Sequence, residues 1–371
     1  MKKILIITYH KVYNYGSSLQ AYATKKAFEE FSSNVEIINF VPNRYKNYGS
    51  FKQVYNEKKY YTNNPIKCLL MTLKSIKIRE RQKKAFDKFD HYLDLGEEYD
   101  SNKLYKEPIK ADLYVTGSDQ VWNNFYGGFE KCFFWDFIPK EANRVAYSAS
   151  FGKSEFTESE MGELNELLKK YKLISVRENT GKTILDSLNI PSIQLLDPVY
   201  YINKNKWDEL KDIPPIAKGK YILIYQLDSH GNLIQEAKKL QAKFADYKII
   251  FIETEKKKRY KDIIYVTIPT VNEFLGLFSN ASFIITDSFH GTTFSICMNK
   301  NFSCVLPKRY ANRIESVLSI LKLDNRVISK DRDILSIYDE PINWLNIEKK
   351  LSIERSKMKN FISDCIKITN K

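Results

Sequence analysis

Cysteine is scarce in this sequence and follows no metal-binding or disulfide pattern. The five cysteines are odd in number, and no pair has the Cys-x-x-Cys spacing. This favours buried free thiols in a reducing compartment over a disulfide framework. The sequence holds no cluster of metal-ligating residues either, so we expect no required metal. Because the free thiols favour a reducing compartment, we expect a cytoplasmic protein.

Long apolar runs are also missing. No stretch approaches the roughly eighteen residues of a membrane span. The start of the chain, Met1–Lys3 followed by Ile4–Ile7, has the order of a signal peptide, but the apolar run is short and Tyr9, His10 and Lys11 interrupt it. We therefore predict that this segment is the first buried strand. The loop after it has no Gly-x-Gly-x-x-Gly motif, so a dinucleotide site has little support.

Acidic residues are fewer than basic ones in this sequence. The chain carries 59 Lys and Arg against 45 Asp and Glu, a net charge of +14. Such an excess suits nucleic acid, an anionic membrane surface or anionic substrates. Neither a zinc-finger spacing nor a ribonucleoprotein-type aromatic motif is found, so we expect no nucleic acid partner. The other two partners stay open, as does a solvated basic surface without a partner.

Buried strands alternate with helices along most of the chain. β-branched runs are followed by small-residue turns and helix-period segments, which is typical of parallel sheets covered by helices. With 371 residues, this predicts an α/β fold of two domains. We place the N-terminal domain at 1–203, the C-terminal domain at 204–342, and a closing helical segment at 343–371 that packs back across both. The best linker is the stretch 202–219, which is rich in Lys, Asn and Pro.

The N-terminal domain contains a helical insertion at about residues 42–95. Residues 42–64 show no clear period, so we predict an irregular start, and residues 65–93 follow a helical pattern. The run 79–84 forms a basic face on that helix. This face suits contact with a membrane or a lipid-linked substrate, whereas a solvated helix surface is the simpler alternative.

The most informative stretch is the junction at residues 283–291. An apolar run ends at Asp287 and a helix pattern follows Gly291, with Ser288 and His290 between them. The carboxyl end of a parallel strand faces the ligand crevice, and the next helix N-terminus favours anions. His290 is therefore placed to bind an anion or to move a proton. The alternative is a loop histidine that bonds to neighbouring backbone.

Two other predicted strands end in polar residues. Gly117–Asn123 gathers small and polar groups, whose backbone N–H groups suit an anion or sugar hydroxyls. Trp122 either stacks on a sugar ring or is a buried anchor. Arg177 ends another strand and suits a bidentate clamp on an anion, with a surface pair to Glu178 as the alternative.

Five motifs at strand ends occur in a fixed order: Asn14–Tyr22, Thr116–Asn123, Ser175–Glu178, Leu195–Pro198 and Thr286–Gly291. Together they resemble the polysaccharide pyruvyl transferase family, over about residues 4–320. The resemblance implies two Rossmann-like domains facing across a cleft, as in GT-B glycosyltransferases. It also implies transfer of the pyruvyl group of phosphoenolpyruvate to a sugar of a surface polysaccharide, such as a capsule or exopolysaccharide, or of its lipid-linked precursor.

The resemblance further implies roles for single residues. Ketal formation needs a general acid, which His290 supplies, and cations for the carboxylate and phosphate of the donor. Some members carry arginine where Ser288 stands, so that donor contact is either missing here or supplied by Lys308, Arg309 or Arg313. The implied donor contacts are Arg177, Ser288, Gly291, Lys308 and Arg313, and the implied acceptor contacts are Asn14, Tyr15, Gly16, Ser118, Asp119, Gln120 and Trp122.

The implied partners are phosphoenolpyruvate as donor substrate and a glycan or lipid-linked sugar as acceptor, with no cofactor required. Peripheral contact with the inner face of the cytoplasmic membrane is a further hypothesis. Two other functions fit the same pattern. One is a GT-B-type glycosyltransferase that uses a nucleotide sugar, and the other is a non-catalytic glycan-binding protein of envelope assembly.

Overall fold

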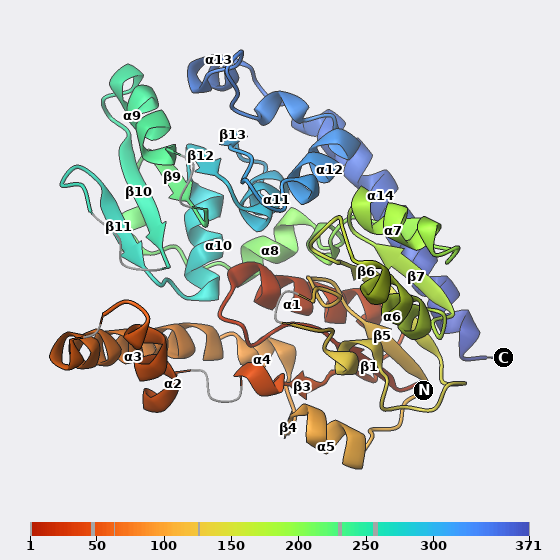
Figure 1. Ribbon diagram of the computed structural model, residues 1–371. Coiled ribbons are helices and arrows are strands. Elements are labelled where there is room, and N and C mark those ends of the chain that lie inside the picture. Colours follow the sequence, from red (N-terminus) through yellow and green to blue (C-terminus); the bar gives the residue numbers. More distant parts are fainter. Residues whose placement is uncertain are drawn as a thin grey trace.

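The computed structural model describes residues 2–45, 49–62, 64–124, 127–228, 232–254 and 259–370 (Figure 1). Met1 and Lys371 lie outside the described residues, as do residues 46–48 and 63 of the predicted insertion. Over the described ranges the chain forms two parallel sheets covered by helices, and a small pair of strands, β3 (Asn39–Phe40) and β4 (Glu98–Tyr99).

The N-terminal sheet has the strand order β2-β1-β5-β6-β7-β8, and its neighbouring strands are parallel. Its central strands are buried along their whole length because both faces of the sheet are covered. Parallel pairing brings the carboxyl ends of the strands to one edge. The strands are β1 (Ile4–Ile7), β2 (Val35–Ile37), β5 (Leu113–Thr116), β6 (Arg144–Ala149), β7 (Leu173–Val176) and β8 (Ile193–Gln194).

The C-terminal sheet has the order β11-β10-β9-β12-β13 and is also parallel. Successive residues of its central strand point to opposite faces, so Ile222 and Ile224 belong to one core and Leu223 to the other. The strands are β9 (Tyr221–Tyr225), β10 (Lys248–Glu253), β11 (Ile264–Thr267), β12 (Phe283–Thr286) and β13 (Phe302–Cys304).

Helices connect these strands. In the N-terminal half they are α1 (Tyr15–Glu29), α5 (Ser101–Lys106), α6 (Glu158–Leu168) and α7 (Asn179–Ser187). In the C-terminal half they are α8 (Lys204–Leu210), α9 (Leu233–Lys243), α10 (Val271–Asn280), α11 (Phe289–Cys297), α12 (Asn312–Leu321) and α13 (Ile334–Asp339). Short 3-10 turns lie at Asn43–Tyr45, Lys131–Phe134, Pro198–Tyr200, Pro215–Ala217 and Asp324–Arg326.

The two halves share one hydrophobic core at their interface. Tyr15 at the start of α1 stacks on Phe274 of α10 with ring centroids 4.4 Å apart, and its hydroxyl donates to the backbone oxygen of Pro269 at 2.8 Å. Beside them, Trp207 of α8 contacts both Tyr22 and Phe294. These aromatic contacts hold α1 against the C-terminal half, and they set the spacing of the cleft above them.

The C-terminal helix α14 (Trp344–Ile368) lies across both halves, as predicted (Figure 1). Near its start, Lys350 Nζ donates to the backbone oxygen of Leu321 at the end of α12, at 2.7 Å. Near its end, Phe361 packs on Tyr147 of the N-terminal sheet, with ring centroids 6.3 Å apart. The helix therefore links the two halves along the side that the figure shows in blue.

Two expectations about irregular segments were wrong. The stretch 42–64 contains a helix, α2 (Phe51–Lys59), which packs on α3 (Pro65–Asp87) ahead of the short α4 (Asp90–Leu93). Caps explain where the first two helices begin, since Ser50 accepts from the N–H of Gln53, and Asn64 caps a helix that starts with proline. The predicted linker 202–219 contains α8, which is anchored by a buried tryptophan. The domain boundaries at 203 and 342 stay predictions.

Candidate active site

A pocket of about 670 Å³ lies where the two halves face each other. The loops after β5, β9, β12 and β13 and the start of α1 all contribute to it, so the carboxyl ends of both sheets meet there. From the N-terminal half it is lined by Asn14, Ser17, Asp119 and Gln120. From the C-terminal half it is lined by Leu227, Asp228, Asp287, Ser288, Phe289, His290, Pro307, Lys308, Arg309, Tyr310, Arg313 and Ile314.

His290 lies in the first turn of α11, at the seam between the halves. Ser288 caps this helix by accepting from the N–H of Gly291 at 3.3 Å. Gly16 faces the imidazole so closely that a Cβ there would lie 1.9 Å from Nδ1 of His290. Gly291 permits a similar approach to Thr286, whose Oγ1 would lie 2.2 Å from an added Cβ. Gly16 is therefore needed for the position of the ring, and Gly291 for the packing of α11 against the end of β12.

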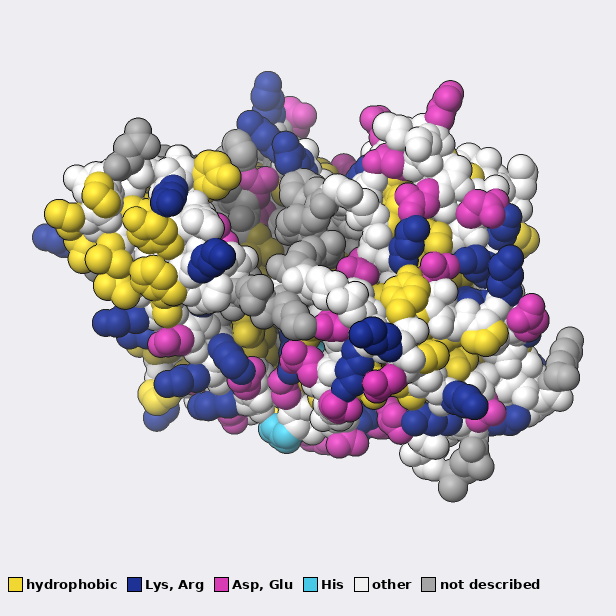
Figure 2. Space-filling view, turned by 60° about the horizontal axis from the view of Figure 1, so that its bottom comes forward, with side chains coloured by type: hydrophobic (Ala, Val, Ile, Leu, Met, Phe, Trp, Pro, Cys, Tyr) yellow, Lys and Arg dark blue, Asp and Glu magenta, His cyan; other side chains and the backbone are white. Residues whose placement is uncertain are grey.

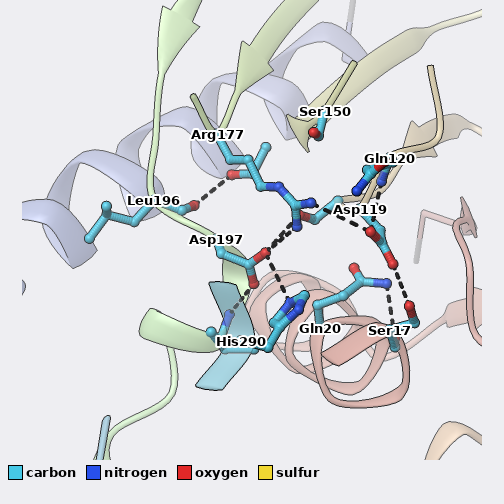
Figure 3. A network of polar contacts seen from close by, with 12 residues as sticks. Ser17, Gln20, Asp119, Gln120, Ser150, Arg177, Leu196, Asp197 and His290 are labelled. Atoms are coloured by element: carbon cyan, nitrogen blue, oxygen red, sulfur yellow. Dashed lines mark hydrogen bonds and ion pairs between the residues drawn. The ribbon is translucent and has the colours of Figure 1, made fainter. Parts of the chain in front are cut away.

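The imidazole is backed by a buried carboxylate. Nε2 of His290 lies 3.7 Å from Oδ2 of Asp197, which also accepts from the hydroxyl of Ser118 at 3.1 Å (Figure 3). Burial raises the pKa of Asp197, but the contacts with His290 and Arg177 outweigh it, so this pKa lies well below its usual range. An ionised Asp197 therefore lies behind the ring, on the Nε2 side, where it can orient the imidazole for proton transfer.

Arg177 lies beneath the pocket, not on its wall. Its side chain is fully buried, and it contacts the carboxylates of Asp197 at 2.7 Å, Asp119 at 3.4 Å and Glu178 at 3.6 Å (Figure 3). Burial lowers the pKa of Arg177, yet these carboxylates outweigh that effect and raise it. Because its charge is already balanced and it is absent from the lining, the structure gives no support to the expected clamp on the donor anion, which stays a prediction. The surface pair is wrong, since Glu178 is also buried.

Asp119 is the carboxylate at the floor of the pocket. The hydroxyl of Ser17 donates to its Oδ2, and Arg177 pairs with its Oδ1. Burial raises the pKa of Asp119, but the charges of Arg177 and His290 and the bond from Ser17 outweigh it and lower the pKa. An ionised acid is therefore held beside the histidine, within a pocket that two sets of loops enclose.

The cations of the pocket come from the segment after β13. Lys308 and Arg309 are exposed on the wall, and Arg313 reaches the pocket from the first turn of α12. Burial and the nearby charge of Arg177 lower the pKa of Arg313 to about 10. Its guanidinium lies 5.6 Å from the ring centre of Phe289, a cation–π distance. The surroundings balance the positive charge of Arg313 poorly, so an anionic ligand would stabilise the charged guanidinium.

Gln120 supports this guanidinium. With its amide oxygen turned toward Arg313, it accepts from the two terminal nitrogens at 2.9 and 3.3 Å. The contact joins the loop after β5 to α12 across the cleft.

Asp287 ties two loops of the pocket together. Its carboxylate accepts from the N–H groups of Leu227 and Asp228 at 2.7 and 2.9 Å, so the loop after β9 is held against the end of β12. Burial raises the pKa of Asp287 to about 6, with a further contribution from the charge of Asp228. This acid titrates above its ordinary range and close to the site.

Several predicted contacts lie away from the pocket wall. Trp122 is buried against Phe134 and Phe151, so the buried-anchor alternative is confirmed and sugar stacking is wrong. Tyr15 is buried at the interface, and the Ser118 hydroxyl is bonded to Asp197, so neither meets an acceptor directly. Gly16 and Gly291 are likewise absent from the lining and act through packing. The lining does contain Asn14, Asp119, Gln120, Ser288, His290, Lys308 and Arg313.

Among the residues that the sequence reasoning missed and the structure brings to the site are Ser17, Asp197, Asp287 and Tyr310. Two of them carried a usable signal. Asp197 and Asp287 each follow a predicted strand directly, at the edge where ligand-binding groups of an α/β sheet collect.

Among the described residues, no group of three or more His, Cys, Asp or Glu is arranged to hold a metal ion. Nor does any described helix have the length and apolar character needed to cross a membrane.

Comparison with solved structures defines the class of fold. A protein from Listeria monocytogenes described as a UDP-N-acetylglucosamine 2-epimerase superimposes with a TM-score of 0.54 at 8% identity, covering 95% of this chain and 90% of that chain. Anabaena Alr3699/HepE, solved with UDP and glucose, gives 0.50 at 7% identity, covering 99% and 100%. This chain therefore has the GT-B-like arrangement of two Rossmann-like domains.

The sequence profile of the polysaccharide pyruvyl transferase family matches residues 14–309. The chain belongs to this family, and it is a transferase, as the order of its strand-end motifs predicted. No match is found among proteins of curated function. The matched range spans the whole pocket apart from Tyr310, Arg313 and Ile314.

Proposed function

We propose that this protein transfers the pyruvyl group of phosphoenolpyruvate to two hydroxyls of a sugar in a surface polysaccharide or its lipid-linked precursor, with formation of a ketal and release of phosphate. One observation carries the proposal: His290, backed by Asp197, shares a single interdomain pocket with Arg313 and Lys308. An acid beside unbalanced cations suits a small donor that is dianionic or trianionic and must be protonated. The free cysteines support a cytoplasmic location.

The donor binds, in this proposal, between α11 and α12. Its phosphate and carboxylate contact Arg313, Lys308 and Arg309, and the N-terminus of α11 adds its positive dipole end. Arg313 thereby replaces the arginine that some members of the family carry at the place of Ser288. Asp119 and Ser17 lie on the opposite side of the pocket, where they contact the acceptor hydroxyls.

The reaction then proceeds by protonation and addition. Protonated His290 gives its proton to C3 of the enol phosphate, which becomes the methyl group, while C2 gains cationic character. The first acceptor hydroxyl adds to C2 and its proton passes to Asp119. The second hydroxyl displaces the phosphate from C2 and closes the ketal ring. Its proton leaves with the phosphate, and the proton on Asp119 returns to His290, so the enzyme is restored. Asp197 orients the imidazole throughout the cycle.

The test follows phosphate release from phosphoenolpyruvate in the presence of a galactoside acceptor. We expect acceptor-dependent release, and a loss of at least about a hundredfold on His290→Ala with little change in melting temperature. His91→Ala is the matched control, because His91 is exposed and remote from the lining. The relatives solved with UDP favour one rival, a glycosyltransferase. Release of a nucleoside diphosphate from a nucleotide sugar, with none of phosphate from phosphoenolpyruvate, would establish that rival instead.

A further inference from the structure

Helix α3 turns an apolar stripe toward solvent. Ile66, Leu69, Leu70 and Leu73 follow the i, i+3, i+4, i+7 spacing of one helix face, and each is between 42% and 71% exposed. The buried residues Cys68 and Thr72 lie between them in sequence and face α2 and the body. An amphipathic helix normally packs its apolar stripe inward, so this helix presents to water the face that it would be expected to bury.

Aromatic residues extend the stripe at the end of the hairpin. Tyr60 and Tyr61 lie at the turn between α2 and α3 and are 90% and 74% exposed, and Phe51 at the start of α2 is also exposed. Figure 2 shows hydrophobic side chains gathered at this end of the molecule, with Lys and Arg among them. Exposed apolar patches of this kind mark surfaces that contact other proteins or membranes.

The patch lies in a strongly basic surrounding. Residues 51–81 contain eight Lys and Arg against two Glu, an excess of six positive charges. One of the two acids, Glu57, already pairs with Arg79 at 2.6 Å. Lys74 and Lys77 continue the apolar stripe along the same face of α3 and are exposed. An apolar face bordered by unbalanced cations is complementary to a layer with an apolar interior and anionic headgroups.

The basic face predicted at 79–84 is not the centre of this surface. Arg79 forms an ion pair with Glu57, and Lys83 forms one with Asp87 at 2.5 Å. The contact surface lies instead toward the start and middle of α3, where exposed apolar side chains and exposed lysines occur together.

We propose that the α2–α3 face, defined as Phe51, Tyr60, Tyr61 and the α3 stripe with Lys74 and Lys77, docks the protein on an anionic lipid bilayer. The stripe enters the boundary of headgroups and acyl chains, the tyrosines lie at headgroup level, and the lysines contact lipid phosphates. Leu70, Leu73, Lys74 and Lys77 also border a hollow of about 640 Å³ that faces the carboxyl ends of β10 and β11. The candidate active site opens on the same edge of that sheet, so docking brings the cleft to the lipid surface. The docking proposal does not rest on the proposed reaction.

Sedimentation of the full-length protein with vesicles tests the proposal. We expect binding to phosphatidylcholine vesicles that contain about 30% phosphatidylglycerol, and weak binding to pure phosphatidylcholine or at high salt. Leu70→Glu with Leu73→Glu should lower the partition coefficient at least about tenfold, and Lys74→Glu with Lys77→Glu should do the same. The control is Leu345→Glu with Ile353→Glu, which alters equally exposed residues on α14 and should leave binding unchanged.

Three outcomes would overturn the proposal. The first is absence of vesicle binding, and the second is equal binding by the Leu70→Glu, Leu73→Glu variant and its control. The third is a dimer of the unmodified protein that this variant converts to monomer while vesicle binding is absent, because a second copy would then cover the face. All substituted side chains are solvent-exposed, so matching melting temperatures will show that the variants fold.

Discussion

At the scale of the residue, the site depends on how buried charges are balanced. Arg177 contacts the carboxylates of Asp197, Asp119 and Glu178 and has no exposed side-chain surface. This leaves Asp197 ionised behind His290 and Asp119 ionised beside it. Arg177 therefore acts as a positioning residue, while Arg309 and Arg313 line the pocket, where a ligand can reach them.

The two arginines should respond differently to removal. Arg177→Ala leaves buried carboxylates without a partner, and we expect a loss of about 3 to 5 kcal/mol in the free energy of unfolding. Arg313→Ala should leave stability nearly unchanged and raise the KM for phosphoenolpyruvate at least about tenfold. Urea unfolding and steady-state kinetics of both variants measure the contrast. A stable Arg177→Ala protein with a raised donor KM would restore the clamp that the sequence suggested.

Asp287 should make stability depend on pH. Its pKa is raised to about 6 by burial, so the folded state holds this proton more tightly than the unfolded chain does. Stability from this group is therefore greatest below the unfolded pKa of about 4 and is lost as pH rises through about 6. Urea unfolding at several pH values should show this decline in the unmodified protein and a flatter profile in Asp287→Asn. Parallel profiles would show that Asp287 titrates normally.

At the scale of the element, the start of α1 and the start of α11 meet at the histidine ring. The lack of a side chain at Gly16 is what allows the approach, since an added Cβ would overlap both Nδ1 and Cγ of His290. Helix propensity alone would favour alanine at this position, because glycine inside a helix is unfavourable. Glycine is therefore required at position 16 by the contact with His290 of α11, and not by the stability of α1 itself.

Gly16→Ala should displace the ring from Asp197 and lower turnover about a hundredfold, because a shift of about 1 Å at a catalytic group has this effect. The matched control is Gly162→Ala in α6, where an added Cβ meets nothing within 4 Å. That change should leave activity intact and stabilise the helix by up to about 1 kcal/mol. Turnover and thermal melting of both variants provide the measurement. Full activity in Gly16→Ala would show that the imidazole of His290 has more room than this close contact implies.

At the scale of the whole molecule, the two halves behave as one packed unit. The core that contains Leu19 of α1 also contains Phe274 of α10 and Phe361 of α14, so apolar burial is continuous across the cleft floor. Neither half can separate without exposing part of this core. The pocket therefore has a fixed floor, and its walls combine loops with the first turns of α1, α11 and α12.

This continuity predicts a single cooperative unfolding transition in calorimetry. Phe361→Ala should cost about 3 to 5 kcal/mol, because Phe361 is buried against Tyr147 of the opposite layer. Leu345→Ser on the same helix is the control, and its exposed side chain predicts a change within about 0.5 kcal/mol. Two resolved transitions in the unmodified protein would mean that the halves unfold independently.

The sequence by itself determined the parallel α/β architecture, the closing helix, the family and the position of His290 between strand and helix. Each of these depends on local periodicity or on the order of motifs, which neighbouring residues specify. It did not determine the partners of Arg177, the burial of Trp122 and Tyr15, or the helix α2 within the stretch thought irregular. Only the tertiary structure decided that Asp197 lies behind His290 and that Arg313 replaces Arg177 as the accessible cation. Burial and charge balance are set by distances through space, and residues far apart in the chain supply them.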